Sequence, residues 1–167
     1  MHLVLRHLEL GGDLSPAGVK KQVAGLVERQ ILSAAEAEAI DAAAIAGFLA
    51  GPLGRRLREA VWIRREWPFY LRLPAWEAFP ESGGALGDET VVIQGIIDCL
   101  FAEPDGLVLI DYKTDRAAGE GVKTLPVDKY RDQLNLYALA VEAILGQRVK
   151  ERYLQFFTAG AFPAVRF

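Results

Sequence analysis

Two acidic residues stand inside segments that are otherwise apolar enough to be buried strands. Asp98 interrupts the run from Thr90 to Phe101, and Asp111 ends the run Leu107–Asp111, with Lys113 two residues further on. A buried carboxylate is costly unless a partner or a metal ion compensates its charge. Because side chains alternate along a strand, Asp111 and Lys113 are expected on one face. The pattern indicates a charged site set into a hydrophobic sheet.

The turn between these two runs controls whether the acidic residues meet. If the loop has an even number of residues, as in Glu103–Gly106, Ala102 pairs with Leu107. Asp98 then lies opposite Asp111. Facing residues of paired strands are about 5 Å apart, which suits one hard cation between two carboxylates. A three-residue loop would shift the register by one and would need a bulge to restore the pair.

On the residues alone, structural roles stay open. Asp111 could cap a strand end, and Asp98 could pair with an arginine. An Asp-x-Lys triplet is a weak signal, because it often arises by chance in a chain of this composition. The wider sequence context therefore has to decide between a structural and a chemical interpretation.

Several motifs, in order and at their spacing, resemble those of a known family. They are His2 in a first helix, a strand Arg65-Glu66-Trp67-Pro68-Phe69, Gly95-Ile96-Ile97-Asp98, Asp111-Tyr112-Lys113-Thr114-Asp115-Arg116, and Gln133 to Tyr137 in a later helix. The chain resembles the RecB-type PD-(D/E)XK nucleases, and among them the C-terminal nuclease domain of AddA-type helicase–nucleases. The resemblance implies an α/β fold with a restriction-endonuclease-like core: a mixed β-sheet flanked by helices, preceded by a helical segment.

The resemblance also implies a metal site. Asp98 and Asp111 would be metal ligands, together with the Tyr112 backbone carbonyl and the His2 imidazole. Oxygen ligands with one imidazole suit Mg²⁺, for which Mn²⁺ would substitute. Lys113 would orient the attacking water and stabilise charge that develops on the phosphate. The implied activity is that of a Mg²⁺-dependent deoxyribonuclease of the ATP-dependent exonuclease V type.

Further residues have both a functional and a structural interpretation. Tyr130, Gln133 and Tyr137 share one helical face, where such a stripe is usually core. An amide on that face needs a partner, and by resemblance Gln133 and Tyr137 support the catalytic centre. Glu66 is a candidate for the surroundings of the metal site, with a surface ion pair as the alternative.

Basic residues offer a path for DNA. Arg116 could contact a phosphate, although a salt bridge in a turn would explain it equally well. Arg55, Arg56 and Arg64 belong to the densest basic region and are candidates for DNA binding, with solvated surface charge as the commoner explanation.

Composition narrows the class of protein. The chain has 167 residues, 51% apolar and 25% charged, which can bury a core and excludes disorder and coiled coil. A net charge of −3 provides no global basic field, so weak and salt-sensitive DNA binding is expected. The lone Cys99 excludes an iron–sulfur cluster, and the absence of a GxxxxGK[ST] motif excludes an ATP site. No signal peptide or membrane-spanning run is present, so we expect a cytoplasmic protein with no membrane partner. The family resemblance implies a bacterial source.

The expected elements form one domain with two parts, a helical part over residues 1–60 that carries His2 and a nuclease core over residues 61–167. Helices are expected at residues 1–10, 16–32, 34–50 and 127–145. Strands are expected at residues 62–73, 90–101, 107–111 and 149–158, with a further one near 162–167, and loops at residues 81–88 and 117–124.

The resemblance implies a place in a larger machine. The domain would cut mainly single-stranded DNA ends during double-strand-break processing and recombinational repair, beside a helicase region of the same chain and a partner subunit of the AddB type. The alternative is a catalytically silent nuclease fold that binds DNA or holds the complex together. A sugar hydrolase with paired carboxylates would leave Lys113 and His2 without a role.

Overall fold

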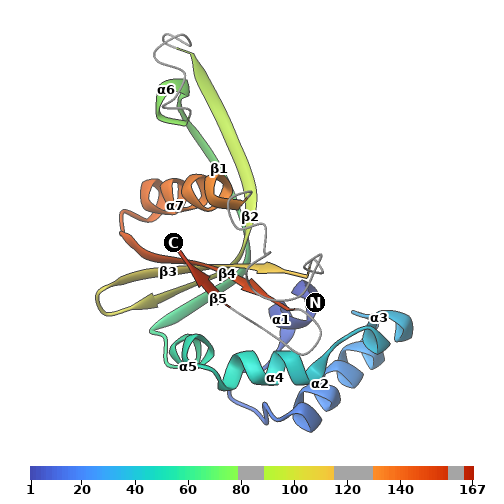
Figure 1. The fold of residues 1–167 in the computed structure, drawn as a ribbon. Coiled ribbons are helices and arrows are strands. Elements are labelled where there is room, and N and C mark those ends of the chain that lie inside the picture. Colours follow the sequence, from blue (N-terminus) through green and yellow to red (C-terminus); the bar gives the residue numbers. More distant parts are fainter. Residues whose placement is uncertain (79–88, 115–129, 158–163) are drawn as a thin grey trace, which may run out of the picture.

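The computed structural model describes residues 1–78, 89–114, 130–157 and 164–167, which form a five-stranded sheet with helices on both faces (Figure 1). The strands lie in the order β1-β2-β3-β4-β5, and only the β3–β4 pair is parallel among the described strands. This mixed sheet flanked by helices confirms the expected fold class. The strand bounds are β1 Trp62–Pro74, β2 Thr90–Glu103, β3 Gly106–Lys113, β4 Val149–Phe156 and β5 Ala164–Arg166.

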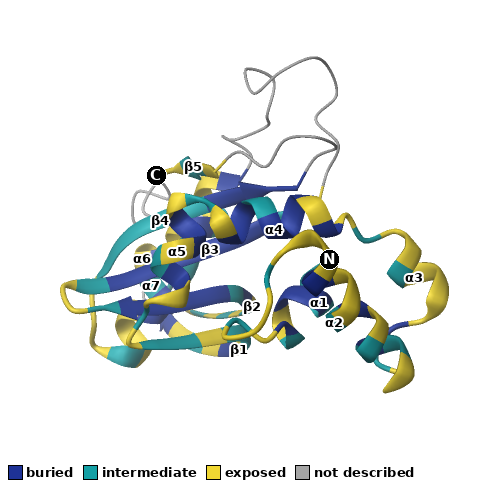
Figure 2. Cartoon of the chain, turned by 90° about the horizontal axis from the view of Figure 1, so that it is seen from below, coloured by how far each residue is buried: buried dark blue, intermediate teal, exposed yellow. Residues whose placement is uncertain are grey.

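The helices divide between the two faces of the sheet. Helices α1, α2 and α4 pack against one face, whereas α7 covers the other (Figures 1 and 2). Short helices α3, α5 and α6 complete the described chain. The helix bounds are α1 His2–His7, α2 Pro16–Glu28, α3 Ala34–Glu38, α4 Ala42–Ala50, α5 Pro52–Arg58, α6 Ala75–Ala78 and α7 Arg131–Leu145.

Local capping groups explain most helix ends. The Ser15 side chain accepts a hydrogen bond from the Gly18 amide at the start of α2, and Ser33 forms a capping box with Glu36 at the start of α3. The single helix expected over residues 34–50 is wrong, because the Asp41 side chain caps a new helix, α4. The basic segment after Gly51 is also helical, as α5.

The hairpin between β2 and β3 has the expected register. Residues 104 and 105 form the turn, and Ala102 pairs with Leu107. The pairing of the two strands ends at Cys99 and Ile110, directly before the two aspartates. The loops expected at residues 81–88 and 117–124 lie outside the described residues.

Alternating side chains of the hairpin supply two separate cores. Cys99, Phe101 and Tyr112 pack with α1, α2 and α4, whereas Leu100 and Leu109 pack with α7. Burial raises the pKa of Cys99 to about 12, so this thiol stays neutral and acts as a small apolar side chain. In the parts of the chain that are described, no helix has the length and apolar character needed to cross a membrane.

Candidate active site

The site lies in the fork where β2 and β3 stop pairing with each other. Beyond Ile110 the Tyr112 amide has no strand partner on β2, and it donates instead to Asp98 Oδ2 at 2.7 Å. The Asp98 carboxylate thus replaces a hydrogen bond of the β-ladder and is fixed in position by the β3 backbone. This explains how an acidic residue is accommodated within an apolar strand.

Helix α1 brings His2 into the same fork. His2 Nε2 lies 3.0 Å from the Tyr112 carbonyl oxygen and 3.4 Å from Asp98 Oδ2. The hydrogen bond to Asp98 raises the pKa of His2 despite partial burial of the ring, because the carboxylate favours the charged imidazolium. An imidazole, a carboxylate and a carbonyl therefore converge on one point.

The donor atoms in the fork fit a hard divalent cation. Neighbouring ligands of an octahedral ion, at about 2.1 Å from the metal, are about 3 Å apart, close to the separations of His2 Nε2 from Tyr112 O and Asp98 Oδ2. No three His, Cys, Asp or Glu side chains in the described segments are grouped closely enough to hold a metal ion. The convergent set consists instead of two side chains and the Tyr112 carbonyl.

Asp111 is buried beside this point. Its side chain and that of Lys113 share one face of β3, as expected, and Asp111 Oδ2 lies 2.6 Å from Lys113 Nζ. Among the described residues this buried Oδ2 has no hydrogen-bond partner, and Lys113 is its ion-pair partner. Burial raises the pKa of Asp111, and the Lys113 charge opposes that effect. An oxygen in this state is suited to a cation as an additional partner.

Helix α7 positions the lysine from the other side. Lys113 Nζ donates to Gln133 Oε1 at 3.4 Å and lies 4.1 Å from the centre of the Tyr130 ring. Gln133 Nε2 in turn donates to the Tyr137 hydroxyl at 2.9 Å. Both polar groups of the Gln133 amide therefore have partners, and this amide links Tyr137 to Lys113.

The glycine of the Gly-x-x-Asp motif has a steric role that the sequence did not reveal. A Cβ atom on Gly95 would lie 2.8 Å from a Phe69 ring carbon and 3.0 Å from a Tyr137 ring carbon. The Phe69 and Tyr137 rings pack edge to face, 5.3 Å apart, directly over Gly95. The missing side chain thus lets Tyr137 approach β2 and hold Gln133.

Glu66 and Asp98 occupy the position that the β1–β2 pairing skips, between the pairs Arg65–Cys99 and Trp67–Ile97, and Glu66 has a left-handed backbone, with φ of 49°. Such a conformation is strained for a residue other than glycine and is concentrated at functional sites. Because of this conformation, the side chains of β1 change sides of the sheet at Glu66. The Arg65 side chain bonds to α1, whereas Trp67, two residues later, packs on the α7 side. Burial and the Asp98 charge raise the pKa of Glu66, which places this carboxyl within the electrostatic reach of the fork.

Arg65 is a further residue of the site, and its role in positioning α1 was not apparent from the sequence. Its Nη1 atom donates to the Leu5 and Leu8 carbonyl oxygens, at 2.9 and 2.7 Å. These carbonyls belong to the C-terminal end of α1, where a cation is favourable. Arg65 thereby fixes the helix that carries His2 to the strand that carries Glu66.

The arginines expected to bind DNA have other partners. Arg56 forms ion pairs with Glu103 at 2.9 Å and Glu151 at 2.7 Å, so its guanidinium is already neutralised, which favours a structural role over the DNA-binding role expected for it. Arg55 donates to the Ala50 carbonyl oxygen at 2.9 Å. The Arg64 guanidinium lies 4.6 Å from the centre of the Trp67 ring. Arg116 lies outside the described residues.

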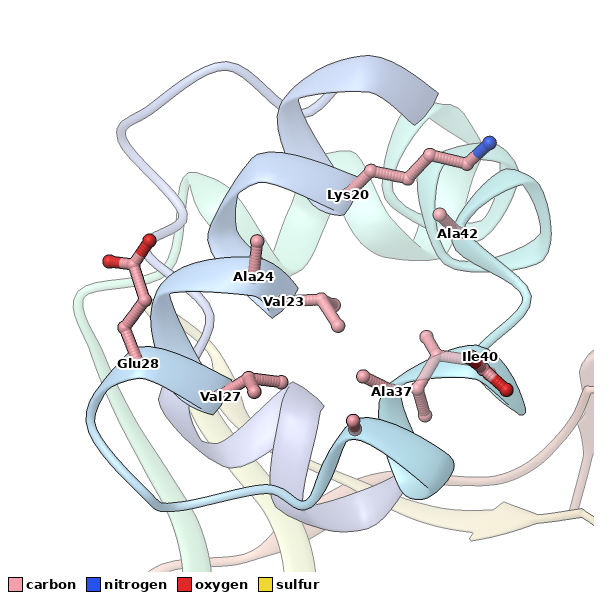
Figure 3. A pocket seen from close by; sticks show the side chains of 10 residues that line it. Lys20, Val23, Ala24, Val27, Glu28, Ala37, Ile40 and Ala42 are labelled. Atoms are coloured by element: carbon pink, nitrogen blue, oxygen red, sulfur yellow. The ribbon is translucent and has the colours of Figure 1, made fainter.

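An apolar groove of about 590 Å³ is present elsewhere, between α2 and the α3–α4 segment. Figure 3 shows Val23 and Val27 of α2 facing Ile40 across it, with Lys20 and Glu28 near its margin. None of the residues predicted for the site lines this groove. The candidate active site is thus a fork of the sheet and not the groove among the helices.

Comparisons with known proteins bear on this geometry. Residues 1–163 match the family model of the PD-(D/E)XK nuclease superfamily. A solved structure titled "Crystal structure of SSO0001" aligns over 99% of this chain and 64% of its own, at a TM-score of 0.45 and 16% identity, a likeness too loose to support an argument.

Three similar curated proteins are each named as a subunit of an ATP-dependent helicase/nuclease. The protein from Desulforudis audaxviator is 60% identical over 99% of this chain, that from Pelotomaculum thermopropionicum 45% over 96%, and that from Geobacillus kaustophilus 43% over 99%. The aligned region makes up 12–14% of the length of these relatives.

Proposed function

The chain belongs to the PD-(D/E)XK nuclease superfamily, and on that premise we propose that it is a metal-dependent deoxyribonuclease domain that cuts mainly single-stranded DNA. The observation that carries the proposal is the convergence of His2, Asp98 and the Tyr112 carbonyl beside buried Asp111 and Lys113. A structural ion pair would account for Asp111 and Lys113, but it would not account for an imidazole directed at a backbone carbonyl and a second carboxylate.

The proposed metal is Mg²⁺, with Mn²⁺ as a substitute. His2, Asp98, Asp111 and the Tyr112 carbonyl would hold it, and the bound ion would lower the pKa of water and polarise the scissile phosphate.

The protein groups then have separate tasks. Lys113 would position the attacking water and stabilise negative charge on the phosphate, because its ammonium lies beside Asp111 at the edge of the fork. Gln133 and Tyr137 would restrict the lysine to that position. Glu66 would orient water or a ligand from the position that the β1–β2 pairing skips.

We also propose a place for the domain in a longer protein. The relatives are each named as a helicase/nuclease component. The proposed role is double-strand-break processing and recombinational repair in the bacterial cytoplasm. DNA would be unwound by a helicase region of the same parent chain, working with a partner subunit of the AddB type. Residues 1–60 and 61–167 would act as one nuclease domain, because His2 and Asp98 come from the two parts.

The test compares purified variants of the chain in Mg²⁺ with a labelled single-stranded oligonucleotide. Lys113→Ala and Asp111→Asn are each expected to lower the cleavage rate by about 10²-fold or more, because each removes a group that acts on the reacting phosphate or its metal. Lys20→Ala, which removes an exposed lysine of α2 outside the fork, is the matched control. Full cleavage by either fork variant, with an unchanged circular dichroism spectrum, would refute the mechanism.

The silent-module alternative has its own test, a calorimetric titration with Mn²⁺. Binding that is lost in Asp98→Asn supports a metal site in the fork. Absence of Mn²⁺ binding together with retained DNA binding would support the silent module instead.

A further inference from the structure

An exposed stripe follows β1 and β2 away from the fork. Three of the six large hydrophobic side chains that are exposed in the described residues lie on it: Tyr70 at 73%, Val92 at 64% and Ile96 at 52% exposure. The exposed residues Pro68, Arg72 and Gln94 complete the set. We call these six residues, which form the cross-strand pairs Pro68–Ile96, Tyr70–Gln94 and Arg72–Val92, the ribbon stripe.

The ribbon stripe faces away from α7. Phe69 and Leu71, which alternate with it along β1, belong to the core beneath α7, and Phe69 packs on Tyr137. The stripe therefore lies on the side of the sheet that α1 covers nearer the fork. Figure 1 shows this part of β1 and β2 extending beyond the remainder of the sheet, with α7 on one side.

The stripe is continuous with the candidate active site. Its first pair, Pro68 and Ile96, comes two residues after Glu66 on β1 and two before Asp98 on β2. Within the fork, the Asp111 and Lys113 side chains are only 5% and 15% exposed, whereas His2 is 40% exposed. Solvent therefore reaches the fork from the His2 side, which is also the side of the stripe.

Resting on the proposed function, we propose that the ribbon stripe binds the nucleotides next to the scissile phosphate of single-stranded DNA. When a single DNA strand places one phosphate at His2 and Asp98, its neighbouring nucleotides lie over Ile96 and Tyr70. The Tyr70 ring offers a stacking surface for a base, and the aliphatic side chains offer apolar contact. Base faces are free in a single strand and covered in a duplex, so the stripe selects unpaired DNA.

Charge favours the same occupant. Arg72 lies in the outermost pair of the stripe, and its guanidinium is held by Thr90 Oγ1 at 3.1 and 3.3 Å while it remains exposed. A cation at this point is suited to bind a backbone phosphate of a DNA strand that lies across Tyr70. A narrow row of apolar groups that ends in a cation matches a polynucleotide better than the broad apolar centre of a protein interface.

The experiment measures binding of a fluorescent single-stranded oligonucleotide to the chain in Ca²⁺ by anisotropy. Tyr70→Ala is expected to weaken binding about tenfold, because it removes the aromatic surface on which a base stacks. Tyr70→Phe keeps the ring and is expected to bind normally. Ile144→Ala, which removes an exposed aliphatic group on α7, is the matched control. Arg72→Gln is expected to weaken binding and to reduce its salt dependence.

The outcomes separate this inference from the proposed function. If Tyr70→Ala binds the oligonucleotide as tightly as Ile144→Ala does, the proposal that the ribbon stripe binds DNA is overturned, whatever the cleavage assay gives. Unchanged DNA binding with loss of binding to the parent helicase region would make the stripe a protein interface and overturn the proposal equally. If the wild-type chain binds DNA through Tyr70 but does not cut it in Mg²⁺, the proposed nuclease function is refuted, and the proposal that the ribbon stripe binds single-stranded DNA still holds. A circular dichroism spectrum of Tyr70→Ala that matches the wild type excludes a packing defect as the cause.

Discussion

His2 shows how one side chain depends on groups that are remote in sequence. Its ring contacts the Tyr112 carbonyl, 110 positions away, and the Asp98 carboxylate. The carboxylate raises the pKa of His2, whereas a metal ligand must be a neutral imidazole. Protons and metal therefore compete for this nitrogen, and Mn²⁺ affinity should rise with pH through the His2 titration.

The two histidines of the chain allow an internally controlled measurement. In metal-free protein, His2 should titrate above 6.5, because its hydrogen bond to Asp98 stabilises the charged form. His7 should titrate below 6.5, because burial and then the nearby Arg6 disfavour its charged form. Proton NMR of the imidazole signals measures both, and Asp98→Asn should lower only the His2 value.

The sign of the stability effect follows. Because the pKa of His2 is raised on folding, its contribution is fully present below pH 6.5 and is lost as pH rises through the folded-state pKa. A measured pKa of His2 that is lower than that of His7 would contradict the geometry of the fork.

At the scale of elements, a six-residue helix is positioned by a strand. Helix α1 is too short to be stable alone. Val4 and Leu5 bury its apolar side, and Arg65 of β1 binds two carbonyls at its C-terminal end. The same strand changes faces at Glu66, so the position of α1 and the strained residue depend on each other.

We expect Arg65→Met to loosen α1 selectively. Loss of two charge-assisted hydrogen bonds should lower the free energy of unfolding by about 1.5–3 kcal/mol. It should also weaken Mn²⁺ binding, because His2 would no longer be held in the fork. Hydrogen exchange of the α1 amides and calorimetry measure the two effects.

Arg64→Met serves as the control for this prediction, because Arg64 lies over Trp67 and does not bind α1. Arg65→Lys keeps the charge but loses the planar set of guanidinium N–H donors, so it should give a partial effect. Equal Mn²⁺ affinity of Arg65→Met and wild type would show that α1 is fixed by its apolar contacts alone.

At the scale of the molecule, Arg56 connects α5, β2 and β4 at a place remote from the active site. From α5 it bonds to Glu103 at the end of β2 and to Glu151 on β4. The Arg56 guanidinium lowers the pKa of Glu103 to about 2. Because this pKa is depressed, the stabilisation is present above about pH 4.5 and is lost as pH falls toward 2.

Arg56→Met should therefore destabilise the fold without affecting the fork. A loss of about 1–3 kcal/mol is expected at neutral pH, between the values for exposed and buried ion pairs. The loss should shrink as pH falls from 4.5 toward 2. Thermal unfolding at several pH values measures this, with Arg55→Met as the control. A pH-independent difference between these two variants would exclude the Glu103 pair as the cause.

The sequence by itself determined the local features of this protein. Alternation along the strand placed Asp111 and Lys113 on one face, the hairpin turn set the register before Asp98, and Ser15 and Ser33 marked helix starts. These features follow from the backbone periodicity and from hydrogen bonds between near neighbours, which residue types specify directly.

Only the tertiary structure decided which distant groups meet. The bonds from Arg65 to α1 and the ion pairs of Arg56 join residues more than 45 positions apart. The contact of His2 with Tyr112, which the family resemblance implied, likewise has no sign in the local sequence. The left-handed conformation of Glu66 is equally invisible in the sequence, because no glycine marks it. Such features depend on packing and burial across the whole sheet, which compensate strain and charge that the local sequence would disfavour.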